Sequence, residues 1–92
     1  MSKELSFIVV IGKDRKGIVA KVSNFLYKNN INIEEISQQV LNDYFVMTAG
    51  VDVQDSKISL QELRDQLTKL GEKMNLKIQL HHEKIFKMMH RV

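Results

Sequence analysis

The chain of 92 residues contains no cysteine, no proline and no tryptophan. Without cysteine it can form no disulfide, no thiolate metal site and no cysteine nucleophile, so a reducing compartment is expected. The longest apolar run, residues 7–11, is too short to cross a bilayer, and no signal-peptide pattern precedes it. We therefore expect a cytoplasmic protein that does not associate with membranes.

The sequence also lacks a strong excess of charge of either sign: it has fourteen basic and eleven acidic residues, and the formal net charge is +3. Such a balance bears on solubility and on weak attraction to anions, and we expect no direct binding of nucleic acid. The composition is that of one globular domain over residues 1–92, with a core over 4–82 and a C-terminal extension over 83–92. A core this small would gain stability from self-association.

Alternating apolar residues predict four strands. Residues 5–11 are apolar in both phases, which is typical of a central strand; we assign Phe7 to the helix-facing side and leave Ile8 and Val10 on the other face. Residues 31–40 predict a second strand with a bulge at Glu34-Glu35. Asn42-Asp43 predicts a two-residue hairpin turn to a third strand over 44–53. Residues 76–80 predict the last strand.

Two helices are predicted between these strands. In the first, Ile18, Val22, Phe25 and Leu26 share one face, and the helix ends at Lys28-Asn29-Asn30. The second opens with a capping box of Ser59 and Glu62. Its apolar stripe ends at Met74 and comprises Leu60, Leu63, Leu67, Leu70 and Met74.

The order β-α-β-β-α-β predicts an α+β, ferredoxin-like sandwich with a four-stranded antiparallel sheet in the order 4-1-3-2 and both helices on one face. The apolar residues of 83–92 predict a short C-terminal helix. The open sheet face, to which we assign Ile8, Val10 and Val46, should be covered by this segment, by a partner subunit or by both.

The loop Gly12–Gly17 joins a strand to the amino end of a helix, where free amides favour a carboxylate or phosphate. A tight turn that needs glycine explains the same loop, and both readings stay open. The histidines at 81, 82 and 90 lack the arrangement of a metal site, and neither a cofactor nor a catalytic residue is indicated. Because Phe7 and Phe45 are assigned to the core, no aromatic platform for RNA is expected.

Residues Gly12 to Ser23, followed by Asn30-Ile31-Asn32-Ile33, resemble the ACT domain family over the whole chain. The resemblance is closest to small stand-alone ACT proteins of bacteria and archaea, and it extends to the ACT domains of the glycine-cleavage repressor. It implies a non-enzymatic, allosteric regulatory module that binds a small amino acid at the interface of a homodimer or higher homo-oligomer and signals to a partner protein. Regulation of transcription is one role that the resemblance suggests. The alternative is a constitutive interaction module without a ligand. The implied ligand site comprises Asp14, Gly17 and Ile18 on one wall, and Asn32 with Ile33 on the other.

Overall fold

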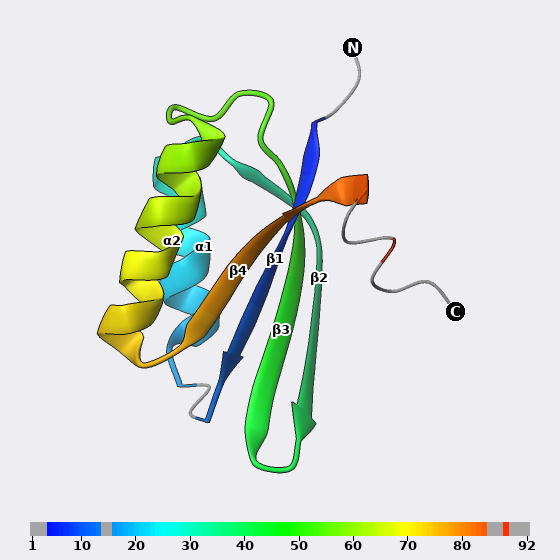
Figure 1. Ribbon diagram of the computed structural model, residues 1–92, viewed down its shortest axis with the longest axis vertical. Coiled ribbons are helices and arrows are strands. Elements are labelled where there is room, and N and C mark those ends of the chain that lie inside the picture. Colours follow the sequence, from blue (N-terminus) through cyan, green and yellow to red (C-terminus); the bar gives the residue numbers. More distant parts are fainter. Residues whose placement is uncertain (1–3, 14–15, 85–87, 89–92) are drawn as a thin grey trace.

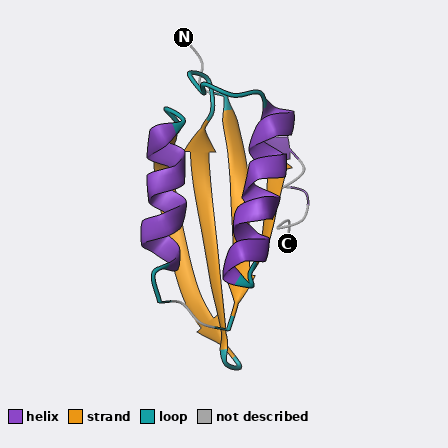
Figure 2. Cartoon of the chain, turned by 90° about the vertical axis from the view of Figure 1, so that its left-hand side faces the viewer, coloured by secondary structure: helices purple, strands orange, loops and turns teal. Residues whose placement is uncertain are grey.

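The computed structural model describes residues 4–13, 16–84 and 88 (Figure 1). The elements follow in the order β1 (Leu5–Gly12), α1 (Ile18–Lys28), β2 (Asn32–Leu41), β3 (Tyr44–Asp52), α2 (Leu60–Met74) and β4 (Lys77–His82). The strands form one antiparallel sheet in the order β2-β3-β1-β4. Both helices cover the same face of this sheet (Figure 2). The predicted ferredoxin-like fold is confirmed.

The local signals of the turns and caps are confirmed as well. Asn42 and Asp43 both have positive φ, 48° and 72°, as a two-residue hairpin turn requires. The β2–β3 register shifts between Ile33 and Glu35, so the bulge lies where the pattern placed it. The predicted C-terminal helix falls mainly on residues 85–87 and 89–92, which lie outside the described residues.

The two helices begin in different ways. At the start of α2, the Ser59 hydroxyl accepts a hydrogen bond from the Glu62 amide at 3.1 Å, and the Glu62 carboxylate accepts one from the Ser59 amide at 3.3 Å. Before α1 stands Gly17, with φ 76°, which has no side chain to cap the helix, and the structure gives no side-chain cap among the residues it describes. The amino end of α1 therefore keeps backbone donors that no described side chain satisfies.

The core lies between the helices and the central strands, and it corrects the predicted orientation of β1. Ile8 and Val10 are fully buried in the helix-facing core, opposite Ala49 and Met47 of β3. The assignment of Phe7 to this side was wrong, since Phe7 lies on the open face opposite Gly50. The assignments of Phe45 to the core and Val46 to the open face hold.

The reason for the error is that β1 is apolar in both phases, so hydrophobicity alone does not show which face it buries. The helix-facing phase contains the small residues Ser6 and Gly12 as well as Ile8 and Val10. A Cβ atom at Gly12 would lie 2.1 Å from Cδ2 of Leu76, which occupies that space. The set of alternating residues that has small side chains at both ends of the strand, Ser6 and Gly12, is therefore the one that fits beneath the helix layer.

Two adjacent valines test this orientation with the same chemical change. Val10→Ala removes two methyl groups from the closed core and should lower the free energy of unfolding by about 2 kcal/mol. Val9 is only half-buried, on the open face, and Val9→Ala should cost less than about 1 kcal/mol. Urea unfolding of both variants measures the difference, and a larger loss for Val9→Ala would contradict the observed phase.

Candidate functional site

The first wall of the implied ligand site is the amino end of α1. The left-handed conformation of Gly17 turns the chain into the helix, and a Cβ atom placed there would meet nothing within 4 Å. The side chain of Ile18 is buried in the core, so this position offers its backbone to the surface. No acidic residue occupies the first turn. The wall can therefore hold an anion through free amides and the positive end of the helix dipole. Asp14, also predicted here, lies outside the described residues.

The second wall is the start of β2. Asn32 is exposed, and its amide donates to the carboxylate of Glu34 two residues along. Ile33 points the opposite way and packs, half-buried, against the core opposite Val51. Asn32 is thus available at the surface, whereas Ile33 mainly anchors the strand.

A small polar hollow of about 200 Å³ adjoins Asn32 at the carboxyl end of α1. The Asn30 amide donates to the Asp55 carbonyl at 3.0 Å, and Asp52 lies directly opposite Asn32 across the strand pair. The hollow combines carboxylates with amides, which can accept hydrogen bonds from an ammonium group. Its lining residues are Tyr27, Asn30, Ile31, Asn32, Asp52 and Asp55.

Sequence reasoning missed Asp52 and Asp55, although one signal for Asp52 was present. Counting the β2–β3 register outward from the Asn42-Asp43 turn, and adding one residue for the bulge, places Asn32 opposite Asp52. Asp55 lies in the connection after β3, and its approach to Asn30 depends on tertiary packing.

The two walls lie at opposite ends of α1 within one protomer. The helix has eleven residues and is therefore about 16 Å long. A single small ligand cannot touch Gly17 and Asn32 of the same chain. The residues that the family resemblance groups together can form one site only when two chains contribute to it.

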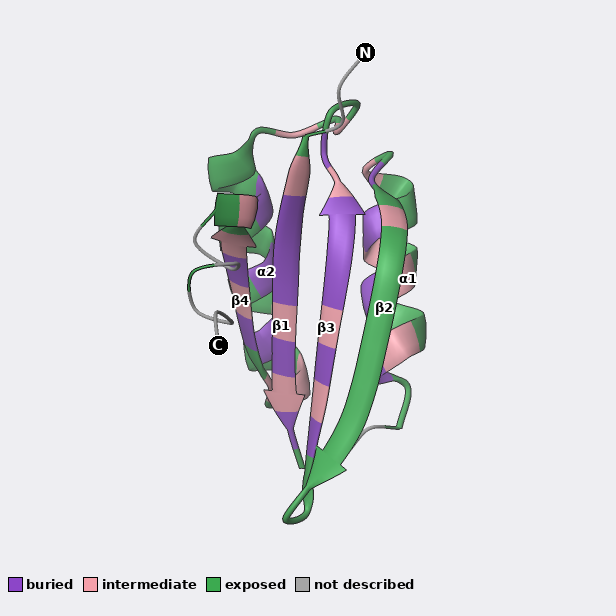
Figure 3. Cartoon of the chain, turned by 90° about the vertical axis from the view of Figure 1, so that its right-hand side faces the viewer, coloured by how far each residue is buried: buried purple, intermediate pink, exposed green. Residues whose placement is uncertain are grey.

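The edge of the sheet next to these walls is unprotected. β2 is hydrogen-bonded only to β3, and it contains no lysine and no proline, the residues that commonly blunt an edge strand. Figure 3 shows that it is exposed along its length except at one half-buried position near its start, Ile33. Exposed apolar side chains gather on this edge and on the neighbouring flank of α1: Tyr27 81%, Ile36 41%, Val40 56% and Leu41 54%.

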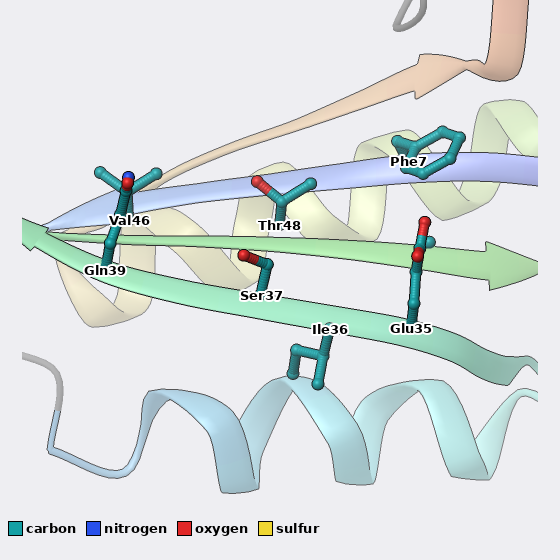
Figure 4. A pocket seen from close by; sticks show the side chains of 8 residues that line it. Phe7, Glu35, Ile36, Ser37, Gln39, Val46 and Thr48 are labelled. Carbon is teal, nitrogen blue, oxygen red and sulfur yellow. The ribbon is translucent and has the colours of Figure 1, made fainter.

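A second hollow, of about 420 Å³, lies on the open face of the sheet (Figure 4). Glu35, Ser37 and Thr48 project into it from β2 and β3, whereas Ile36 points the other way, toward α1. Gly50 leaves room for the Phe7 ring: a Cβ atom there would lie 3.0 Å from both Phe7 Cε1 and Glu35 Cγ. This hollow was missed because β1 was read in the wrong phase.

Phe7 provides no stacking surface, although it lies on the open face. The Phe7 side chain is only 7% exposed, so its ring is not accessible to a base. Among residues 4–13, 16–84 and 88, no group of three potential ligands could hold a metal ion. His81 approaches Gln79 at 3.3 Å, and the His82 ring accepts a hydrogen bond from the Lys84 amide at 3.1 Å.

Comparisons with known proteins agree on one family. The family model for the ACT domain matches residues 6–71. A UPF0237 protein of Methanopyrus kandleri is 45% identical over 85 residues, which is 92% of this chain and 94% of that protein. An ACT domain protein from Streptococcus pneumoniae superposes with a TM-score of 0.82 at 38% identity, covering 94% of this chain and 97% of that one.

A third likeness concerns the fold alone. A protein assigned as a glycine cleavage system transcriptional repressor superposes with a TM-score of 0.76 at 19% identity, covering 88% of this chain and 48% of that one.

The chain belongs to the ACT domain family. It is a domain of the regulatory type, and its family is not one of enzymes. The helices in the described part of the chain are each too short or too polar to span a membrane.

The packing at Gly50 gives a prediction for the open face. Gly50→Val would force its branched side chain into Phe7 and Glu35, and should lower the free energy of unfolding by about 1–3 kcal/mol. In a Phe7→Ala background the same change should cost less, because the clashing ring is gone. Thermal and urea unfolding of the four proteins in this cycle measure the coupling. Equal costs in the two backgrounds would show that the two side chains do not share this space.

Proposed function

We propose that the protein is a cytoplasmic regulatory homodimer that binds a small amino acid at its subunit seam and passes the signal to a partner protein. The observation that carries the proposal is the separation of Gly17 and Asn32 at opposite ends of α1. A two-fold axis between two β2 edges reverses the direction of α1 in the second subunit. The amino end of α1 in one subunit then faces the Asn32 hollow of the other.

The chemistry of the two walls is complementary to a zwitterion. The free amides at Gly17 and Ile18 suit a carboxylate. Across the seam, the hollow with Asp52 and Asp55 suits an ammonium group, and Asn32 can bond to either end of the ligand. The bare edge of β2, with its apolar side chains, supports the pairing of two subunits.

Membership of the ACT domain family supports the proposed regulatory role. The closely similar relatives are small proteins of about the same length as this chain, as the coverage of both partners indicates. A regulatory domain acts by changing the behaviour of a partner, and the repressor of the same fold suggests transcription as one target of such regulation.

A second function is favoured by the exposed apolar residues of β2. Burial of Ile36 and Val40 in a subunit interface would be favourable whether or not a ligand is present. A constitutive dimerisation module would need this edge and would leave the polar hollow empty.

A thermal-shift panel of the twenty amino acids distinguishes the two functions. A ligand at a hundred times its dissociation constant should stabilise the folded protein by about 2.7 kcal/mol. A clear rise in melting temperature with one or a few small amino acids is expected. If none of the twenty shifts the transition, the constitutive module is the better description.

Asn32→Ala should remove ligand response and spare the fold, because its side chain is exposed and its hydrogen bond within the described residues is a local one, to Glu34. Loss of a charge-assisted hydrogen bond should weaken binding of the selected amino acid by about ten- to a hundredfold. Asn24→Ala, an exposed asparagine on the other flank of α1, is the matched control and should bind normally. Calorimetric titration of both variants is the measurement, and equal affinities would place the site elsewhere.

Ile36→Lys should separate the subunits. This side chain lies on the β2 edge and is 41% exposed in one chain, so the change is tolerated by the monomer but places a charge in the seam. Dimer affinity should fall by more than about tenfold, an unpaired buried charge being strongly unfavourable. Leu60→Lys, at a similarly exposed leucine outside the seam, should leave the mass of the dimer in solution unchanged. Light scattering after gel filtration reports both, and a dimeric Ile36→Lys protein would exclude this edge.

A further inference from the structure

The outer surface of the helix layer contains a groove between α1 and α2. The helices lie side by side on the sheet (Figure 2), yet no Cα atom of α1 comes within 8 Å of one in α2. Half-buried Phe25, Leu70 and Met74 form the floor of the groove. One hollow of about 580 Å³ and a second of about 370 Å³ share Phe25, Leu70 and Lys73, so the groove is continuous.

The rim of the groove carries charge of one sign. Lys21 and Lys28 border it from α1, and Lys69 and Lys73 border it from α2. The remaining polar lining residues, Asn24 and Gln66, are neutral, and no carboxylate stands among the lining residues that the structure describes. The groove is thus lined by basic and neutral side chains, in a chain whose fourteen basic and eleven acidic residues nearly balance.

The helix dipole favours only half of these lysines. Lys28 and Lys73 occupy the last turns of their helices, where a cation interacts favourably with the helix dipole. Lys21 stands near the amino end of α1, where the dipole disfavours a cation, and Lys69 lies well inside α2. Lys69 stands four residues after Asp65, a spacing that supports the helix. Even so, Lys21 and Lys69 on the two sides of one apolar floor would complement an anionic partner with an apolar face.

We infer that this groove binds an acidic amphipathic helix of a partner protein. Apolar side chains at spacings of three and four residues would contact Phe25, Leu70 and Met74, and carboxylates on both flanks would meet the lysines. A nucleic acid would bring phosphates to the rim but leave the apolar floor without a partner. A membrane surface fits less well, because the apolar side chains are recessed between the helices instead of protruding.

The groove and the proposed ligand seam use opposite flanks of α1. Lys21, Phe25 and Lys28 face the groove, whereas Tyr27 borders the hollow beside β2. One protomer can therefore use both surfaces at once. The assignment deepens the proposed function by naming the surface for its partner, and it rests on that function only for the link to amino-acid sensing.

The probe is a fluorescent synthetic helix of about fifteen residues, which matches the length of α2 at about 22 Å, with leucines on one face and glutamates on both flanks. Its companions are a scrambled peptide of the same composition, polyglutamate, a short DNA duplex and anionic phosphatidylglycerol vesicles. All titrations use the full chain without amino acids, so the result is independent of ligand binding at the seam. The amphipathic peptide should bind best, and added salt should weaken its binding.

The decisive variant is Lys21→Gln/Lys69→Gln, which removes charge from both sides of the groove at positions that the helix dipole does not favour. Loss of two partly exposed ion pairs should weaken peptide binding by roughly three- to tenfold. Lys57→Gln/Lys77→Gln removes the same charge outside the groove and should bind like the unchanged protein. Circular dichroism checks that both variants are folded, and Leu70→Ala should also weaken binding because it removes part of the floor.

Four outcomes would overturn the assignment: no peptide binding, equal binding of the scrambled peptide, equal losses in the groove variant and its control, or tighter binding of DNA or vesicles. If no amino acid shifts the melting temperature but the peptide binds specifically, the result would contradict ligand binding at the seam and would still support the assignment of the groove.

Discussion

The burial of Ile8 and Val10 beneath the two helices is the constraint on which the rest of the molecule depends. These side chains meet the helix stripes through Ile18, Val22 and Leu63, and all five are almost inaccessible to solvent. Once β1 is oriented in this way, Phe7 has to face the other side of the sheet, since neighbouring strand residues alternate. The ring opposite Gly50 and the hollow beside it follow from that orientation.

Helix α1 is the element that all the proposed interactions share. One flank holds the helix to the core through Ile18, Val22 and Leu26. A second flank, with Tyr27, borders the open edge of the sheet, and a third, with Lys21 and Phe25, forms one side of the basic groove. A ligand clamped at the ends of α1 would contact the helix that also shapes the partner surface. This gives a short physical route by which occupancy of the seam can alter binding in the groove.

The regulatory nature of the family fits the proposed separation of the ligand seam from the partner surface. A small domain has little interior to spare for an enclosed pocket, so binding at a seam between subunits is the economical arrangement. The unequal helix starts are compatible with the proposed seam. The capping box closes α2 on itself, whereas Gly17 leaves the amino end of α1 open.

Local backbone chemistry was readable from the sequence. The helix bounds, the Ser59–Glu62 capping box, the Asn42-Asp43 turn and the bulge at Glu34 were all predicted, because each depends on residues close together in the chain. The strand order followed from the same elements and from the right-handed crossover rule. Of the proposed site, Gly17, Ile18, Asn32 and Ile33 came from a family resemblance, and the hairpin register could have added Asp52.

The tertiary structure decided features for which the local sequence pattern allows more than one arrangement. The sequence of β1 is apolar on both faces, and only the fit of Gly12 beside Leu76 and of Ile8 and Val10 beneath the helices selects which face is buried. The sequence also determined that Gly17 and Asn32 belong to different elements. Only the folded chain placed them at opposite ends of α1, and brought lysines from two helices to one groove. The physical reason is that hydrogen-bonded turns and caps are local, whereas packing joins residues that are distant in the chain.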